Sequence, residues 1–388
     1  MQTVTQNIPS VPLLDVNRGN HAIRDEIVAA LTEVVDSGKF LHGPQVTELE
    51  TQIAKLCHTK HAIGCASGSD ALLLALMGLE LEPGDEVIVP SFTFFATASC
   101  VDRLGAKIVF ADINPQTYNI DPASIEACIT NRTRAIIPVH LFGQSAEIDV
   151  ICKIAARRDI PVIEDAAQAI GAAYHGRPIG SWGQIGCLSF YPTKNLGGLG
   201  DGGMLTTNSD TLNDRMRLLA AHGMKPRYYH SAVGINSRLD TLQAAALLVK
   251  TKHLDEYSLA RHGNASRYST LFEQSGLSQK VGLPFQDPAA FHVWNQYSLR
   301  VGEGRRDALK AYLQQNGVGC EIYYPVPLHK QQCFQGKSCS QVSLPETERA
   351  AREILHIPVY PELTSSEQHR VVDVIDQYYR EAYSKAVA

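Results

Sequence analysis

Between residues 62 and 207, short apolar runs alternate with amphipathic stretches. The runs have the length of buried strands, and stretches between them, such as Ser69–Gly78 and Glu147–Arg158, carry apolar residues at helical spacing. This alternation predicts an α/β domain around a largely parallel sheet, with the chemistry on loops at the strand ends. The expected strands lie at 61–67, 85–91, 106–112, 133–140, 160–165, 184–191 and 202–208.

The pattern changes after Ser237. A long helical stretch with few helix-breaking residues continues as far as Gly276. The remainder combines a strand-like segment, a helical stretch, a Pro-rich turn and a helical ending. We therefore predict a large α/β domain over residues 1–250 and a smaller C-terminal α+β domain over residues 251–388.

Length and charge exclude several classes of protein. The 388 residues exceed the usual length of one domain, and 44% hydrophobic and 19% charged residues are ordinary proportions for a soluble enzyme. A formal net charge of -5 does not suggest binding to nucleic acid or to an anionic membrane. The amino terminus lacks the features of a signal peptide, and no apolar run could cross a bilayer, so we expect a cytoplasmic protein.

The spacing of cysteines and histidines argues against disulfides and metal sites. The chain has 9 cysteines without a CxxC pair, and Cys65, Cys100 and Cys187 lie inside apolar runs. We interpret them as reduced, mostly buried residues. The 14 histidines show no spacing typical of zinc ligands, so we expect no metal ion.

A lysine and a carboxylate follow two of the predicted strands. Lys194 comes just after a turn at Pro192, and Glu164 and Asp165 end the strand at 160–165. A lysine can hold a carbonyl cofactor as an imine, and a carboxylate can accept the N–H of a cationic pyridine ring. Lys194 and one of these two carboxylates, which alternation along the strand points to opposite sides, are therefore candidates for a pyridoxal-phosphate (PLP) site. From these segments alone, a solvated loop lysine and a helix N-cap are the ordinary alternatives.

Other segments supply candidates for holding the phosphate and the flat face of such a cofactor. Gly68 and Ser69 lie where a predicted strand passes into a helix, so N–H groups and a hydroxyl face an anion there. Ser189 adds a hydroxyl near Lys194, and Phe94 is a candidate for packing on the ring. A helix cap, a strand residue and a core aromatic are equally ordinary interpretations of these positions.

Three glycines form a motif that we interpret as a coincidence. Gly198, Gly200 and Gly203 match the GxGxxG fingerprint of dinucleotide-binding proteins. In that fingerprint the glycines open a helix after a strand, whereas here they precede a predicted strand. We therefore do not expect a nicotinamide cofactor.

Five segments together resemble a known family. In order along the chain they are CASGSDAL, PSFTFFATA, VIEDAAQAIGA, SFYPTKNLGGLGDGG and GINSRLDTLQAA. This series resembles the DegT-type (DegT/DnrJ/EryC/StrS) sugar aminotransferases, and the resemblance covers nearly the whole chain. It implies PLP fold-type I (aspartate aminotransferase-like), with a mixed, mostly parallel sheet in the large domain and a smaller α+β C-terminal domain.

The resemblance implies roles for individual residues. Lys194 resembles the lysine that binds PLP as a Schiff base, Asp165 the partner of the pyridine nitrogen, and Gln168 a residue beside the ring and its hydroxyl. To act on the substrate proton, Lys194 needs a neutral amine, and hence a pKa below the roughly 10.4 of free lysine. The other cofactor contacts that the resemblance implies are Gly68, Ser69, Phe94, Ser189 and Asn236.

Asn236 matches an asparagine that reaches the phosphate of a neighbouring subunit in this family. The resemblance therefore implies a homodimer with shared active sites. Residues in neighbouring motif-bearing loops have equally good surface, packing or substrate-binding explanations, and their roles stay open. These residues are Arg227, Tyr229, Arg238, Tyr323 and His329.

The implied reaction moves an amino group from an amino acid, usually glutamate, to a nucleotide-linked keto sugar. SFYPTKNLG and NSRLDTLQAA look closer to the branch that acts on 3-keto sugars than to the 4-keto branch, and we lean to C-3. Alternatives are a 4-keto sugar aminotransferase, a dehydratase and a PLP-binding regulator without turnover. Lys194 argues against the dehydratases, which carry histidine in its place. The motifs identify neither the nucleotide nor the sugar.

Overall fold

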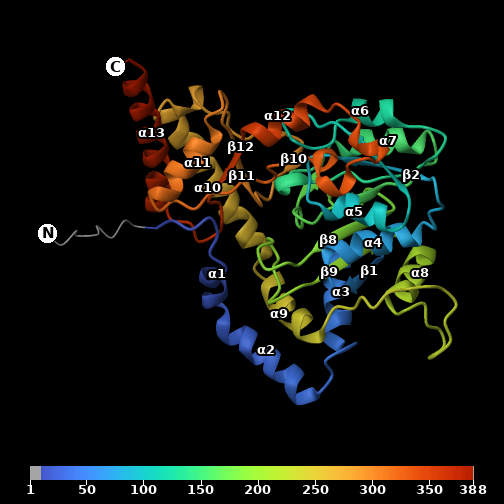
Figure 1. Cartoon of the computed structure of the whole chain (residues 1–388). Helices are drawn as coiled ribbons and strands as arrows, with labels where there is room; N and C mark the ends of the chain where they lie inside the picture. Colours follow the sequence, from blue (N-terminus) through green and yellow to red (C-terminus); the bar gives the residue numbers. More distant parts are fainter. Residues whose placement is uncertain (1–9, 388) are drawn as a thin grey trace.

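A mostly parallel sheet forms the centre of the molecule (Figure 1). The computed structural model describes residues 10–387, with side chains through residue 381, so most of the amino-terminal segment judged to lack a signal peptide lies outside the described residues. Parallel bridges Ile136–Val162 and Val139–Asp165 join a three-stranded to a four-stranded group, in the order β3-β2-β4-β5-β8-β9-β1. Only β9 runs against its neighbours in this sheet. The strands are β1 (His61–Cys65), β2 (Glu86–Pro90), β3 (Lys107–Ala111), β4 (Thr133–Ile136), β5 (Ile163–Asp165), β8 (Ile185–Ser189) and β9 (Gly203–Thr207).

Helices cover both faces of this sheet, and six of its seven strands contribute buried apolar side chains to both of two separate layers. One layer packs α3, α6, α7 and α9 against the sheet, and the other packs α4, α5 and α8. The helices are α3 (Pro44–Leu56), α4 (Gly68–Gly78), α5 (Ala96–Arg103), α6 (Pro122–Cys128), α7 (Ile148–Ala156), α8 (Asp210–Ala220) and α9 (Thr241–Thr251). The predicted fold class, a fold-type I α/β domain with a mostly parallel sheet, is confirmed.

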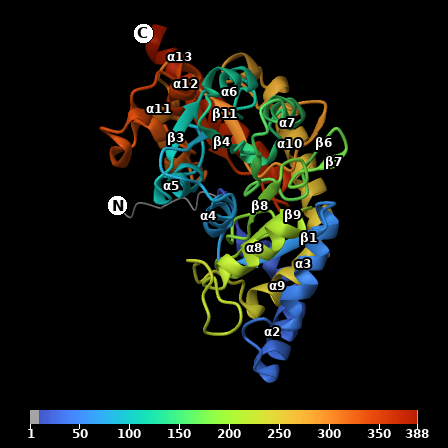
Figure 2. The ribbon, with the colours of Figure 1, turned by 90° about the vertical axis from the view of Figure 1, so that its right-hand side faces the viewer.

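The carboxy-terminal part has its own apolar core, to which Val11 also contributes. Val11 pairs with Val318, so the amino-terminal segment lies along this part before α1 (Val16–Ala22) and α2 (Arg24–Ser37) lead away from it (Figures 1 and 2). Residues 328–344 instead pack in the layer of α4 and α5, and the boundary predicted at 250/251 stays a prediction. This part contains α10 (Leu254–Gln274), β11 (Tyr297–Arg300), α11 (Arg306–Gln315), α12 (Pro345–Glu353), β12 (Ile354–Ile357) and α13 (Ser365–Val387).

Short elements complete the described chain. The strands β6, β7 and β10 form a small antiparallel sheet, and turns of 3-10 helix occur mainly in the carboxy-terminal part. They are β6 (Ala173–Tyr174), β7 (Arg177–Pro178), β10 (Ala290–Phe291) and 3-10 turns at Leu141–Gly143, Leu277–Gln279, Leu328–Lys330, Gln332–Phe334 and Ser338–Ser340.

The helical stretch predicted from Ser237 to Gly276 is two helices. The α9 helix ends at Thr251 and α10 begins at Leu254, with a turn at Lys252 and His253 between them. Neither proline nor glycine marks this break, so the local sequence gave no signal for it. The turn has a tertiary cause: α9 packs on the central sheet, whereas most of α10 packs in the carboxy-terminal core.

Two sequence-based expectations concern the chain as a whole. The cysteines are free thiols, and most of them are buried. None of the helices formed by residues 10–387 combines the length and the apolar character that crossing a membrane requires.

Candidate active site

The candidate lysine and carboxylate come together because β5 and β8 are parallel neighbours. Asp165 is the last residue of β5 and lies opposite Cys187 of β8. β8 ends at Ser189, and a turn in which the Lys194 N–H bonds to the Tyr191 carbonyl brings the lysine back over the strand ends. The charges of Lys194 and Asp165 influence each other. The site thus lies at the carboxyl ends of the parallel strands, where α/β folds place their chemistry.

Alternation along β5 gives its two carboxylates different environments. Glu164 is fully buried and accepts hydrogen bonds from the backbone N–H groups of Gly180, Trp182 and Gly183. The ring Nε2 of His140, also buried, lies 3.1 Å from the same carboxylate. Glu164 thus uses its acceptor capacity to hold the loop at residues 180–183. Asp165 therefore remains as the carboxylate available for a ligand.

Asp165 is buried and held by two hydrogen bonds. The Thr97 hydroxyl donates to Oδ2 at 2.8 Å, and the Ala167 N–H donates to Oδ1 at 3.2 Å. No helix begins at Ala166, so Asp165 is not a helix cap. Burial raises the pKa of the Asp165 carboxyl, and the Thr97 hydrogen bond and the charge of Lys194 oppose this rise. A bound cation would favour the charged carboxylate further.

Lys194 as a whole residue is half-buried. Burial lowers its pKa to about 8, although the Asp165 carboxylate acts in the opposite direction. The following residue, Asn195, fixes the loop: its amide donates to the Val293 carbonyl at 2.8 Å and accepts from Asn295 at 2.9 Å. Lys194 therefore has the neutral fraction that a nucleophile needs, on a backbone that is anchored on both sides.

Gln168 lies near Asp165 with its amide orientation set by two contacts. Its Oε1 accepts from the Phe142 N–H at 2.7 Å, which directs Nε2 toward the Tyr324 hydroxyl at 3.3 Å. Tyr324 is close enough to Asp165 for that carboxylate to raise its pKa, although burial is the larger cause. Tyr324 directly follows Tyr323 at the start of the Pro-rich turn, but sequence reasoning singled out Tyr323 and missed Tyr324.

The structure places the phosphate candidates against one another. Gly68 opens α4, and a Cβ on it would lie 2.6 Å from the Cβ of Ser189. Ser69 is the next residue of α4, and the first N–H groups of a helix lack partners within the helix. Three of the predicted anion contacts thus meet at the start of α4, where the helix dipole favours a negative charge.

Phe94 and Asn236 lie at more exposed positions. Phe94 is 58% exposed, and its ring centroid is 6.3 Å from that of Tyr324. Asn236 is exposed and lines a cavity of about 440 Å³ with Ser67 and Arg238. Both residues have surface available for a ligand or for another subunit.

The residues whose roles stayed open have distinct environments. His329 is buried, with its ring nitrogens 2.7 Å from the Ser91 hydroxyl and 3.3 Å from Glu348, which indicates a packing role. The guanidinium of Arg227 lies 4.9 Å from the centroid of the neighbouring Tyr228 ring. Tyr229 is exposed, whereas Tyr323 is half-buried.

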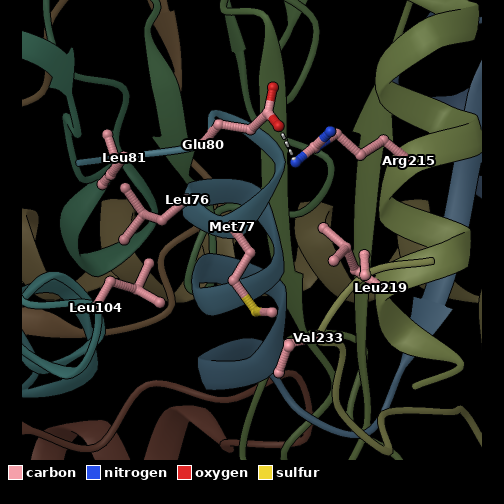
Figure 3. Close-up of a pocket in the computed structure, with 9 residues that line it drawn as sticks. Leu76, Met77, Glu80, Leu81, Leu104, Arg215, Leu219 and Val233 are labelled. Carbon is pink, nitrogen blue, oxygen red and sulfur yellow. Dashed lines mark ion pairs between the residues drawn. The ribbon is translucent and has the colours of Figure 1, made fainter. Parts of the chain in front are cut away.

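A second cavity, of about 220 Å³, lies away from these residues (Figure 3). Its lining is largely aliphatic, and an ion pair of 2.6 Å between Glu80 and Arg215 borders it. None of the candidate site residues lines this cavity. The charged groups of its lining, Glu80 and Arg215, are paired with each other.

The family comparison covers most of the chain. The sequence model of the DegT/DnrJ/EryC1/StrS aminotransferase family matches residues 21–376. The chain belongs to this family. Members of the DegT family are PLP-dependent aminotransferases, and so is this protein. The residues present fit the cofactor: a half-buried lysine, a buried carboxylate with acceptor capacity left and an anion cradle lie within one site.

Individual relatives match over nearly their whole length. The pleiotropic regulatory protein of Geobacillus stearothermophilus is 47% identical over 96% of this chain and 99% of its own. The UDP-N-acetyl-3-dehydro-alpha-D-glucosamine 3-aminotransferase of Acidithiobacillus ferrooxidans is 42% identical over 96% and 98%. The crystal structure of S. venezuelae DesV in complex with a ketimine intermediate has a TM-score of 0.91, at 40% identity over 95% and 98% of the two chains.

Proposed function

We propose that this protein transfers the amino group of L-glutamate to C-3 of a nucleotide-linked keto sugar. The observation that carries the proposal is the pairing of Lys194, whose pKa is lowered to about 8, with the buried Asp165 at adjacent strand ends. The name of the Acidithiobacillus relative supports C-3 of a UDP-linked sugar. A Bacillus subtilis relative, 36% identical, is named 3-oxo-glucose-6-phosphate:glutamate aminotransferase, which supports the donor.

Each residue has a defined task in this proposal. Asp165 accepts a hydrogen bond from the pyridine nitrogen and keeps the ring cationic. PLP, when bound, supplies a ring that withdraws electrons from the substrate carbon. Lys194 Nζ, as a neutral amine, removes the proton from that carbon and returns it. Gln168 Nε2 donates toward the ring hydroxyl while Phe142 holds the other end of the amide.

The start of α4 anchors the cofactor phosphate in this proposal. Gly68 lets the phosphate approach the backbone, and Ser69 and Ser189 donate hydroxyl hydrogen bonds. Phe94 packs against the ring face from its exposed position. These groups bind and orient the cofactor, and they leave proton transfer to Lys194.

The experiment that tests the reaction separates its two halves. The purified protein with PLP is mixed with L-glutamate alone, and the visible absorbance is recorded before and after. We expect loss of the cofactor's long-wavelength band and formation of the pyridoxamine form. Addition of a UDP-linked 3-keto sugar then restores the original spectrum, whereas a 4-keto sugar does not. An unchanged spectrum with glutamate would contradict the proposed donor.

The name of the Geobacillus relative makes a regulator without turnover the second candidate. Such a protein would bind PLP yet leave its spectrum unchanged with every amino acid and sugar. The position of Lys194 beside the buried Asp165 at adjacent strand ends favours turnover, and burial keeps part of the Lys194 amine neutral for proton transfer.

We also propose a homodimer in which Asn236 reaches the partner's phosphate. The exposure of Asn236 and of the large side chains on the same loop supports this arrangement. Co-expression of a Lys194→Ala chain with an Asn236→Ala chain tests it. In mixed dimers one site carries both defects and the other carries neither, so activity well above that of either variant alone is expected. Activity no higher than that of the variants would argue for sites contained in one chain.

A further inference from the structure

Two buried threonine hydroxyls form a chain that ends on Asp165. Thr97, in the first turn of α5, is fully buried, and its hydroxyl lies 2.8 Å from Asp165 Oδ2. Thr93 lies four residues earlier, in the loop before α5, and is 2% exposed, with its hydroxyl 3.1 Å from that of Thr97. Both threonines come from the loop and helix after β2, a different segment from the strand that carries the carboxylate.

The proton count fixes the direction of this chain. A hydroxyl has one proton to donate, and Thr97 donates it to the carboxylate. Thr97 therefore accepts the bond from Thr93, so both hydroxyl dipoles point toward Asp165. Hydrogen bonds in series polarise one another, which strengthens the last one. Together with the Ala167 N–H on Oδ1, the chain holds both carboxylate oxygens in place.

We propose that Thr97, supported by Thr93, is a positioning residue that orients the Asp165 carboxylate and stabilises its charge for the pyridine nitrogen of PLP. This inference rests on the role proposed for Asp165. A buried carboxylate without donors would be costly to ionise. The two bonded oxygens keep further acceptor capacity, which the ring N–H uses. Valine would fill the same volume at position 97 but donate nothing.

The charged and titratable neighbours of Asp165 do not replace the threonines. Burial raises the pKa of Asp165, and Thr97 is the largest of the opposing influences, ahead of Ala167, Lys194 and His140. The remaining groups that Asp165 influences are neutral thiols and a phenol, from Cys100, Cys187 and Tyr324.

The test compares Thr97→Val with Thr97→Ser, which keeps the hydroxyl. The readouts are the Kd of PLP for the cofactor-free protein between pH 5 and 9 and the absorbance of the bound cofactor. Thr97→Val is expected to weaken PLP binding by about 10- to 100-fold and to move the acid limit of binding to higher pH. The pH limit moves upward because a carboxylate without its donor protonates more readily. Thr97→Ser should stay within about threefold of the wild type.

A matched control separates this role from simple packing. Thr206 is also fully buried, and its hydroxyl donates to the Gly180 carbonyl at 2.6 Å in another part of the sheet. Thr206→Val should lower the melting temperature without changing the pH dependence of PLP binding. If Thr97→Val behaves like Thr206→Val, the proposal is overturned.

Two further variants make every outcome decisive. Thr93→Val keeps the direct bond to Asp165, so it should shift the pH limit in the same direction by a smaller amount. If Thr97→Val cannot be purified, a wild-type pH profile of Thr93→Val overturns the chain. Asp165→Asn tests the role of Asp165 itself, on which the role of Thr97 depends. If this variant leaves the cofactor spectrum and the PLP affinity unchanged, the proposed function of Asp165 fails, whatever the result for Thr97.

Discussion

The buried end of the candidate site and the loop between α8 and α9 differ in how their side chains are satisfied. Those of the buried end have partners within the chain, whereas those of the loop face solvent. At the buried end, Asp165, Gln168 and Asn195 each have hydrogen-bond partners within the chain. On the loop, Tyr228, Tyr229 and Val233 are 74%, 69% and 92% exposed. Figure 1 shows this loop standing away from the sheet. The polar side chains of the first region find their hydrogen-bond partners within one chain. The second region exposes apolar side chains to solvent.

The difference does not come from a lack of order in the loop. Its backbone bonds to itself, with Lys225 N–H to the Tyr229 carbonyl at 2.8 Å and Ser231 N–H to the Gly223 carbonyl at 2.9 Å. A Cβ on Gly223, whose φ is +66°, would lie 1.9 Å from the Ala232 carbonyl oxygen, so glycine is required there. A loop that fixes exposed aromatic rings is suited to contacts outside its own chain.

The largest effect is expected from a substitution at the buried end of the site. Lys194→Ala should reduce amino transfer by about 10⁴-fold or more, because the residue supplies both the covalent anchor and the proton transfer. Steady-state assays with glutamate and a keto sugar measure the loss. Transfer within tenfold of the wild type would remove Lys194 from the chemistry.

Lys250 provides the matched control for that variant. It is 7% exposed, burial lowers its pKa to about 8, and its Nζ donates to the Gly197 carbonyl at 2.8 Å. Burial thus lowers the pKa of both lysines to about 8, but Lys250 is the more buried of the two, and Lys194 is the one influenced by Asp165. Lys250→Met should lower thermal stability but keep transfer within about tenfold, because a lowered pKa without that carboxylate does not make a cofactor site.

The second prediction concerns pH, and it tests whether Lys194 titrates as a buried amine or as a solvated surface lysine. Below its pKa of about 8, Lys194 is protonated and cannot attack an aldehyde. Covalent capture of PLP by the cofactor-free protein should therefore rise about tenfold per pH unit up to pH 8 and then level off. Stopped-flow absorbance measures the rate.

The variant Asp165→Asn tests the direction of the pKa shift of Lys194. The Asp165 carboxylate raises the pKa of Lys194, so its removal should move the plateau to lower pH. A capture rate that keeps rising toward pH 10 in the wild type would mean that Lys194 is solvated like a surface lysine.

The third prediction concerns the tight contact at the start of α4. Gly68→Ala would place its Cβ 2.6 Å from the Ser189 Cβ and 3.3 Å from the Ser189 Cα, so the anion cradle must open. We expect PLP affinity to fall by about tenfold, measured by titration of the cofactor-free protein. Gly263→Ala is the control, because nothing lies within 4 Å of that position on α10, and it should raise stability by about 0.5–1 kcal/mol. Unchanged PLP affinity in Gly68→Ala would place the phosphate elsewhere.

Sequence reasoning reached the buried end because its pattern is local. Apolar runs that end in Asp165 or in the turn before Lys194 predict strand ends, and parallel strands bring such ends together. Alternation along β5 only places Glu164 and Asp165 on opposite sides of the strand, and the family resemblance selected Asp165. The hydrogen bonds of Glu164 to a neighbouring loop agree with that choice. The roles of the predicted residues nevertheless stay predictions until variants are measured.

What sequence reasoning missed depends on contacts between distant segments. Thr97 lies 68 residues from Asp165 along the chain, and Tyr324 lies 156 residues from Gln168. A threonine inside an apolar motif and one of two adjacent tyrosines give no local sign of their partners. The break between α9 and α10 was missed for the same reason, because the two helices pack in different apolar cores.

The smallest expected effect concerns the exposed loop. Replacing Tyr228 and Val233 by serine removes apolar surface that makes few contacts within the chain, so the melting temperature at high protein concentration should change by about 1 °C or less. If the loop is covered by a second subunit, the dimer Kd should rise about three- to tenfold, measured by sedimentation. Leu259→Ser on α10 is the control, because Leu259 is also exposed, at 62%, but lies outside the loop, and its dimer Kd should stay unchanged. An equal change in both variants would mean that the loop is ordinary surface, and the contrast with the buried end would then concern solvation alone.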